Sequence, residues 1–145
     1  MASVVAVCIS SAKGVSKLPV ASAVFKVGIG MEGDAHAGGD AVREVSLLAM
    51  ESIGKMDGGG REFKPGDFAE NITTSGIVLA SLPVGTRLQA GGEVTLEITQ
   101  IGKKCHSGCA IFKEVGNCIM PKEGVFARVI KGGTVRPGDG IQVLG

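Results

Sequence analysis

The 145-residue chain contains no tryptophan and no tyrosine, and its five aromatic residues are all phenylalanine. Exposed aromatic rings are the usual stacking platforms for single-stranded nucleic acid, so their scarcity argues against that class of ligand. The formal net charge of +1 supplies no global electrostatic attraction for nucleic acid. No apolar stretch approaches the ~20 residues that a membrane-spanning helix needs. We therefore predict a protein with neither a nucleic-acid partner nor a membrane partner.

Signals for export are also lacking. Residues 1–10 are apolar, but they have no basic n-region and no clear cleavage site, so we expect a first strand rather than a signal peptide. Without a sign of secretion, the four cysteines are expected to be reduced and the protein cytoplasmic. Cys8 lies within an apolar stretch and is predicted to be a small core residue.

Glycine, by contrast, is abundant, with 24 residues where about 7% of the chain would be usual. Because each interior glycine costs a helix ~1 kcal/mol relative to alanine, this composition argues against a helical bundle. It favours many tight turns between short strands. The length points to one domain over residues 1–145, since domains commonly span ~100–150 residues.

The clearest strand is predicted over residues 93–101, where Val94, Leu96 and Ile98 alternate with polar residues. Short strands separated by glycine turns predict a mainly β protein, a compact closed β-barrel with two or three short helices. The helices are expected over residues 48–56, near 77–82 and over 109–115. The remaining strands are expected over residues 4–9, 23–27, 45–47, 68–73, 87–89, 125–130, 134–135 and 141–144.

Three cysteines, Cys105, Cys109 and Cys118, fall within fourteen residues. One hypothesis is a small zinc- or iron-binding or redox-responsive module that uses all three, with a histidine as a further ligand. The spacing is not a common zinc or iron–sulfur pattern, however. Inert core packing is a second alternative, more plausible for Cys118 than for Cys105.

A third hypothesis is a reactive thiol at Cys105. Lys103, Lys104 and His106 place positive charge beside it, and a helix is predicted to start a few residues later. Cations and a helix N-terminus both stabilise a thiolate and lower the pKa of the thiol. A thiolate is required both for nucleophilic sulfur chemistry and for metal ligation.

The C-terminal third is basic, with seven Lys and Arg against three acids over residues 100–145. Ordinary solvated faces would explain this imbalance, and so would a basic rim for an anionic ligand.

Several ordered motifs together resemble the MOSC domain, the module named after the C-terminal domain of molybdenum cofactor sulfurase. A Gly-Asp-x-His-x-Gly segment begins at Gly33, and Lys-Lys-Cys-His ends at His106. The Lys-Lys-Cys-His version resembles members associated with molybdopterin biosynthesis proteins more than the Arg-Pro-Cys branches. The resemblance covers about residues 3–145, and its segments are 33–39, 66–74, 84–88, 100–106, 124–128 and 135–139.

This resemblance implies a closed β-barrel similar to the pyruvate-kinase barrel domain and one functional cysteine, Cys105. Such domains handle the molybdenum cofactor (molybdopterin), and the cysteine is proposed to carry sulfur as a persulfide or to bind molybdenum directly. Sulfur transfer or a molybdenum-cofactor-dependent activity would follow. The implied partners are a cysteine desulfurase or molybdenum cofactor biosynthesis proteins, and a molybdoenzyme that accepts the product.

The resemblance also suggests the residues around the thiol. His36 is expected near Cys105 as a proton handler or ligand contact, although a hydrogen bond that stabilises its loop would explain it equally well. If Glu70 faces the site, its carboxylate would repel the Cys105 thiolate, so we expect a cation near Glu70. The candidates for binding the anionic cofactor at the mouth of the site are Lys103, Lys104, Arg87, Arg128, Asn71 and Glu70.

Overall fold

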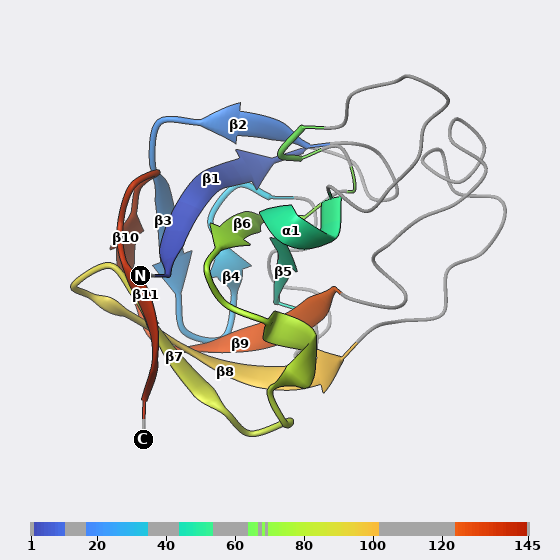
Figure 1. Ribbon diagram of the computed structural model, residues 1–145. Helices are drawn as coiled ribbons and strands as arrows, with labels where there is room; N and C mark the ends of the chain where they lie inside the picture. The colour runs from blue at the N-terminus through green and yellow to red at the C-terminus, as the bar shows by residue number, and fades with distance from the viewer. Residues whose placement is uncertain are drawn as a thin grey trace, which may run out of the picture.

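The structure is a computed structural model, and it describes residues 2–10, 17–34, 44–53, 64–66, 68, 70–101 and 124–144. Short strands dominate it, as the glycine-rich composition predicts (Figure 1). The helical elements described are α1 (Met50–Ile53) and a 3₁₀ turn (Leu79–Ser81). The strands are β1 (Ser3–Ile9), β2 (Leu18–Val20), β3 (Ala23–Lys26), β4 (Gly30–Met31), β5 (Val45–Ala49), β6 (Ile72–Ser75), β7 (Arg87–Ala90), β8 (Val94–Ile101), β9 (Val125–Lys131), β10 (Gly133–Val135) and β11 (Ile141–Leu144).

Two sheets organise these strands. The larger has eight strands in the order β11-β7-β8-β9-β5-β6-β1-β2, and the smaller has the order β10-β3-β4. Neighbouring strands pair antiparallel except β5 and β6, which are parallel. The predicted mainly β class is therefore confirmed.

The predicted closed barrel is wrong, because the larger sheet is open, with β11 at one edge and β2 at the other. Among the described residues, β1 and β11 form no continuous ladder. The start of β1 meets the chain around the start of β11 at the isolated bridge between Ser3 and Gly140 and through backbone hydrogen bonds that join Ala2 and Val4 to residues 138–141. Alternating hydrophobicity indicates which face of a strand is buried, but it carries no information on whether the outermost strands pair. The expected similarity to the closed pyruvate-kinase barrel domain is wrong for the same reason, since the larger sheet is open.

The core lies between the inward faces of the sheets. Val94, Leu96 and Ile98 of β8 are fully buried, whereas Thr95 and Glu97 between them are partly exposed, as the period of two predicts. All five residues of β5 are buried, since it lies in the interior of the eight-stranded sheet. Cys8 is a buried thiol that forms no disulfide, which confirms its predicted place in the core.

Most predicted elements are present, with three differences among the described residues. β6 begins at Ile72 instead of residue 68, because Asn71 occupies a bend before the strand. The α1 helix begins at Met50 instead of residue 48, since Leu48 and Ala49 continue β5, and residues 54–56 of the predicted helix lie outside the described residues. The short strands β2 and β4 were not anticipated. The helix predicted over residues 109–115 lies outside the described residues.

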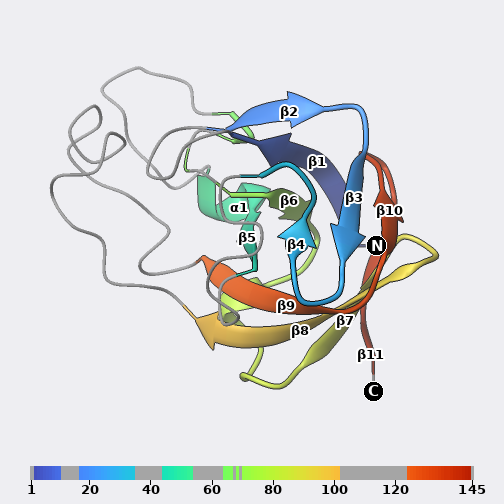
Figure 2. The same cartoon turned by 180° about the vertical axis from the view of Figure 1, so that it is seen from behind.

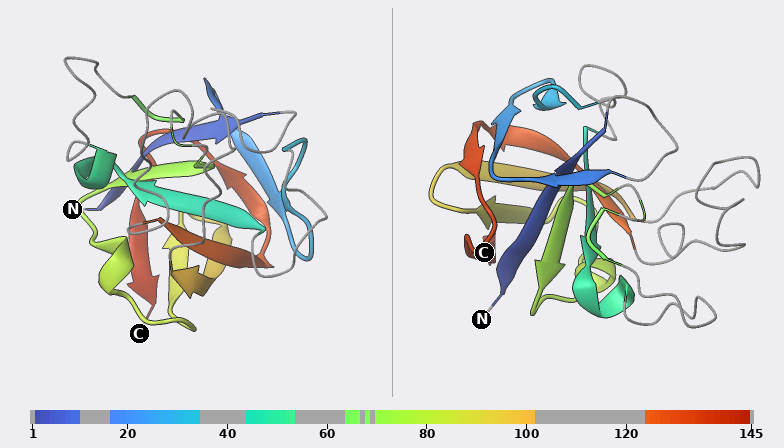
Figure 3. Two further views of the ribbon diagram at one scale, coloured as in Figure 1. Left: turned by 90° about the vertical axis from the view of Figure 1, so that its right-hand side faces the viewer. Right: turned by 90° about the horizontal axis from the view of Figure 1, so that it is seen from above.

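The ends of several strands gather on one side of the molecule. The end of β1, the start of β2, the end of β8 and the start of β9 lie opposite the two chain termini (Figure 1). β3 and β10 lie near the termini, as the view from behind also shows (Figure 2). The left panel of Figure 3 looks onto the side where the strand ends gather. Within the described ranges, no helix is long and apolar enough to cross a membrane.

Candidate functional site

The predicted residues nearest to the proposed chemistry, Cys105, His36, Lys103 and Lys104, lie outside the described residues, as do Cys109 and Cys118. Their flanks are described. Ile101 at the end of β8 pairs with Val125 at the start of β9. The chain on both sides of the Cys105 segment is therefore anchored at one place, the end of the β8–β9 ladder.

A buried ion pair lies on the side where the strand ends gather. The Lys17 ammonium is 2.8 Å from Oδ1 of Asp34, and each side chain is only 1% exposed. Lys17 also donates to the Ser10 hydroxyl at 3.0 Å, and the Ser10 N–H donates to the same Asp34 oxygen at 3.1 Å. These three residues, here called the Lys17 triad, join the end of β1, the start of β2 and the turn after β4.

Gly66 packs tightly against the backbone of Lys17. The Lys17 N–H donates to the Gly66 carbonyl at 2.7 Å, and Gly66 has a φ of +90°, a left-handed conformation that favours glycine. A side chain at this position would collide with the Lys17 carbonyl oxygen and would lie 3.3 Å from the Cys8 sulfur. Glycine is thus required here by both conformation and space.

Glu70 is fully buried and closes this turn. Its Oε2 accepts from the Gly66 N–H at 3.1 Å and from the Thr73 hydroxyl at 2.7 Å. Among the described residues, its Oε1 has no hydrogen-bond partner. Burial raises the pKa of Glu70, although these hydrogen bonds oppose the rise. The role predicted for Glu70 in cofactor binding stays a prediction.

Asn71 joins three strands through its side-chain amide. Its Oδ1 accepts from the N–H and the hydroxyl of Ser46, at 3.0 and 3.1 Å. Its Nδ2 donates to the Cys8 carbonyl at 3.3 Å and contacts the Met31 sulfur at 3.5 Å. Asn71 is fully buried, and these contacts connect the bend before β6 to β1, β4 and β5. Donation from this amide to a bound oxyanion stays a prediction.

Arg87 and Arg128 come together on the outer face of the sheet. Both flank Glu97, with Arg87 Nε 3.3 Å from Oε2 and Arg128 Nη2 2.7 Å from Oε1. The three residues are cross-strand partners on β7, β8 and β9. The hydrogen bond from Arg128 and, to a lesser extent, that from Arg87 lower the pKa of Glu97. This group, the Glu97 triad, holds two guanidinium groups for one carboxylate, and the arginine side chains are about half exposed.

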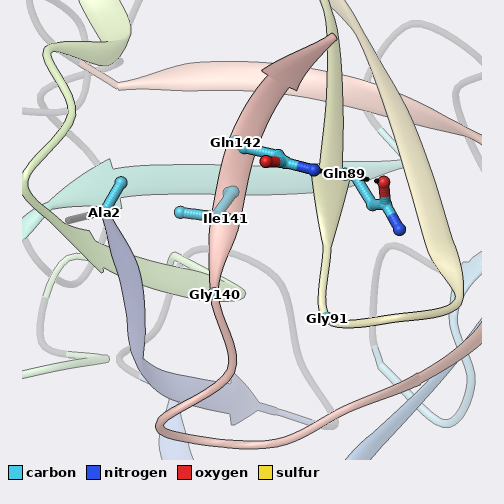
Figure 4. Close-up of a pocket in the computed structure, with 6 residues that line it drawn as sticks. All are labelled: Ala2, Gln89, Gly91, Gly140, Ile141 and Gln142. Carbon is cyan, nitrogen blue, oxygen red and sulfur yellow. Dashed lines mark hydrogen bonds between the residues drawn. The ribbon is translucent and has the colours of Figure 1, made fainter.

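A cavity of about 270 Å³ opens beside the start of β1, next to β7 and β11 (Figure 4). Gln142 donates to Gln89 at its rim, at 3.4 Å. No charged side chain and no thiol is among its described lining residues, so the cavity lacks the groups that sulfur or metal chemistry needs. It is lined by Ala2, Gln89, Gly91, Gly140, Ile141 and Gln142.

The described residues bring together no group of three or more His, Cys, Asp or Glu that could hold a metal ion. Sequence reasoning missed Lys17, the most buried cation described. Its position before the apolar residues 18–20 is a weak signal, and its partner Asp34 is 17 residues away, beyond any local pattern. A buried pair of this kind is recognisable only once the strands have been placed.

The two-sheet fold and its buried polar residues define a small glycine-rich β domain. Comparison with known proteins shows the family to which this domain belongs. The model of the MOSC domain matches residues 33–142. The chain therefore belongs to the MOSC domain family, whose name links it to molybdenum cofactor sulfurase. This confirms the resemblance drawn from the motifs around His36 and Cys105. Comparison with curated protein sequences gives no significant match.

Solved structures with the same fold include the YuaD protein from Bacillus subtilis, with a TM-score of 0.80 and 19% identity over 99% of this chain and 96% of that one. YiiM from Geobacillus stearothermophilus has a TM-score of 0.78 and 20% identity over 100% and 76% of the two chains. YiiM from Escherichia coli has a TM-score of 0.69 and 18% identity over 100% and 70%. At these identities, the likeness establishes the fold.

Proposed function

We propose that this MOSC-domain protein handles sulfur or the molybdenum cofactor through the thiolate of Cys105. The observation that carries the proposal is the Lys-Lys-Cys-His sequence ending at His106, within a chain of this family. Lys103 and Lys104 stabilise the thiolate and attract an anionic partner. The described residues on either side of this segment, Ile101 and Val125, are paired at the end of the β8–β9 ladder.

In the sulfur-carrier form of the proposal, the Cys105 thiolate attacks the outer sulfur of a persulfide on a donor protein. The donor's S–S bond breaks, a new S–S bond forms on Cys105, and the donor cysteine leaves as a thiolate. No net oxidation takes place, because the sulfane sulfur only changes its carrier. His36 would serve as the proton handler for the leaving or arriving thiolate.

In the cofactor-binding form, Cys105 would ligate the metal of the molybdenum cofactor, and cationic side chains would hold its phosphate. The Glu97 triad fits an anion in charge, since it carries one more positive than negative group on an open face. Glu97 lies four residues, about 13 Å at ~3.3 Å per residue, before the end of β8. Arg87 and Arg128 are therefore proposed to contact the outer part of the ligand, with Lys103 and Lys104 nearer the thiol.

The cofactor, when bound, would supply the metal centre for the thiolate. Glu70 and Asn71, the remaining candidates for cofactor binding, are fully buried and hydrogen-bonded to Gly66 and to the Cys8 carbonyl, and they would support the site from within the fold. The proposed partners are a cysteine desulfurase or molybdenum cofactor biosynthesis proteins as donor and a molybdoenzyme as acceptor. A cytoplasmic location, expected from the sequence, is part of the same proposal.

Intact-protein mass spectrometry tests the proposal directly. The protein is incubated with a cysteine desulfurase and cysteine, and separately with molybdenum cofactor, and spectra are recorded under denaturing and native conditions. We expect either one added sulfur that maps to Cys105 or a cofactor adduct, and loss of both in Cys105→Ser.

Cys118→Ser is the matched control, because it removes a neighbouring thiol and should load like the unchanged protein. Full loading of Cys105→Ser would overturn the proposal. Bound zinc or iron that disappears in Cys109→Ser or Cys118→Ser would instead establish the three-cysteine metal module.

A further inference from the structure

Three neighbouring strands of the larger sheet carry charged residues on the face that points away from the core. β7, β8 and β9 lie side by side, and Glu97 is the cross-strand partner of both Arg87 and Arg128 (Figure 1). The residues on either side of Glu97 in β8, Leu96 and Ile98, are fully buried, so the Glu97 side chain points to the opposite face. The Glu97 triad is therefore a group of charges on the outer face of the sheet.

One carboxylate orders both guanidinium groups. Arg128 donates to Oε1 of Glu97 from Nε at 2.9 Å and from Nη2 at 2.7 Å. Arg87 donates to Oε2 from Nε at 3.3 Å. The two arginines bind different oxygens, so they do not compete for one acceptor. Glu97 is 18% exposed, whereas the side chains of Arg87 and Arg128 are 53% and 49% exposed. Two solvent-accessible cations are thus held by one more buried anion.

Most donors of the two guanidinium groups remain unused. Each guanidinium has five N–H donors. Arg87 uses one of them on Glu97, and Arg128 uses two. Within the part of the chain that the structure describes, neither side chain makes a further hydrogen bond or ion pair. Planar guanidinium donors match the geometry of phosphate oxygens, and the triad has one more positive than negative group.

The next row of residues on the same face adds neutral donors. Gln89 on β7 is the cross-strand partner of Thr95 on β8. Both lie two residues from a member of the Glu97 triad, so the period of two places them on the same face. Gln89 accepts from Gln142 through Oε1, which leaves its amide N–H groups to donate. A ligand held by the arginines would therefore meet further donors and no further carboxylate in this row.

We propose that Glu97 is a positioning residue that presents Arg87 and Arg128 as one binding site for a phosphate monoester. The source of the phosphate rests on the proposed function, in which a small ligand also reaches Cys105. The proposal adds that an acidic residue improves the binding of an anion. Arginine side chains that are already ordered lose less conformational entropy when the ligand binds, and this gain exceeds the repulsion between the Glu97 carboxylate and phosphate.

Glu97→Gln tests the proposal, because the two effects of the carboxylate have opposite signs. The substitution keeps the size of the side chain and raises the surplus of the triad from one positive charge to two. If charge alone decided, phosphate would bind more tightly to the variant. We expect instead that its dissociation constant rises by about fivefold, since the ligand must then order two flexible side chains. Tighter or unchanged binding would overturn the proposal.

The measurement is a titration with inorganic phosphate at fixed ionic strength, followed by NMR through the Nε–Hε signals of Arg87 and Arg128. Both signals should shift with one saturation curve, and Arg87→Met should weaken the response of Arg128. The melting temperature of Glu97→Gln should stay unchanged, because exposed ion pairs add little stability. Weaker binding at an unchanged melting temperature therefore reports positioning rather than a loosened fold.

Glu93→Gln is the matched control for the change in charge. Glu93 is exposed and lies four residues before Glu97, about 13 Å along the chain at ~3.3 Å per residue. Its loss removes the same charge and leaves both arginines on Glu97, so phosphate binding should not weaken. A loss equal to that of Glu97→Gln would contradict the positioning role.

Arg136, an exposed arginine outside the triad, shows whether the site is specific. Its Nε–Hε signal should not move at phosphate concentrations that saturate the triad. Equal shifts at Arg136, Arg87 and Arg128 would mean an adventitious ion only and would overturn the proposal.

The same titration with Cys105→Ser separates this inference from the proposed function, because phosphate binding at the triad does not need the thiol. Absence of saturable phosphate binding, with sulfur or cofactor loading of Cys105 intact, would overturn this inference alone. Phosphate binding at the triad together with full loading of Cys105→Ser would overturn the proposed function alone.

Discussion

Two groups of charged residues in this protein use similar chemistry in opposite surroundings. The Lys17 triad is buried at the side where strand ends gather, and the Glu97 triad lies across three strands on the solvent-facing surface. In the first, ammonium and carboxylate have no water to replace a lost partner. In the second, water and salt screen each charge. Ion pairing therefore fixes the relative positions of chain segments in the Lys17 triad, whereas in the Glu97 triad it adjusts the charge of the surface.

The comparison predicts very different responses to loss of one charge. Lys17→Met leaves Asp34 buried without its cation, and we expect the free energy of unfolding to fall by about 3–5 kcal/mol. Arg128→Met is the matched change in the Glu97 triad and should alter stability little, because exposed ion pairs are screened. Urea unfolding of both variants provides the measurement. Similar losses in the two variants would contradict the distinction.

A second prediction concerns the backbone beside the buried triad. Gly66→Ala combines a left-handed φ with a collision against the Lys17 carbonyl, and we expect it to cost about 2–4 kcal/mol. Gly85→Ala is the control, since Gly85 has a similar φ of +96° but nothing within 4 Å of an added Cβ. It should cost about 1 kcal/mol from backbone strain alone. Equal melting temperatures for the two variants would show that close packing at Gly66 is unimportant.

The smallest expected effect is a pair of opposite pH dependences. Burial raises the pKa of Glu70 above its ordinary value of 4.5, so its stabilising contribution is complete below that value and is lost as the pH rises through the raised pKa. The Arg128 hydrogen bond lowers the pKa of Glu97, so its contribution is present above 4.5 and is lost as the pH falls through the lowered pKa.

Urea midpoints across a pH series, for the unchanged protein, Glu70→Gln and Glu97→Gln, resolve these two contributions. The urea midpoint of the unchanged protein minus the midpoint of Glu70→Gln should decline as the pH rises. The corresponding difference for Glu97→Gln should rise with pH and shrink in high salt. A flat difference for Glu70→Gln would mean that its carboxyl is not desolvated in the folded protein.

The local hydrophobic pattern was sufficient to predict the strands that bury one face. The alternation from Val94 to Ile98 predicted β8 because a half-buried strand must alternate, and the structure confirms it. β4 was missed because Gly30 and Met31 are too few residues to show any period. β2 was missed for a similar reason, and its Pro19 weakens the strand pattern further.

The candidate site could be predicted only in part. The motifs identified the family, and they placed Arg87 and Arg128 among the cations, which the fold brings together on Glu97. They did not reveal Lys17, because a buried cation is defined by a partner that folding brings to it. They also did not reveal that Asn71 and Glu70 are bonded to their own chain.

By itself, the sequence determined the family, the mainly β class and most strand positions, because hydrophobic period, glycine turns and motif order are local properties. The tertiary structure alone decided that the larger sheet stays open, that Lys17 meets Asp34, and that one side of the molecule gathers the strand ends. These features depend on pairings between residues far apart in the chain. Such pairings follow from strand order and burial, which no local pattern records.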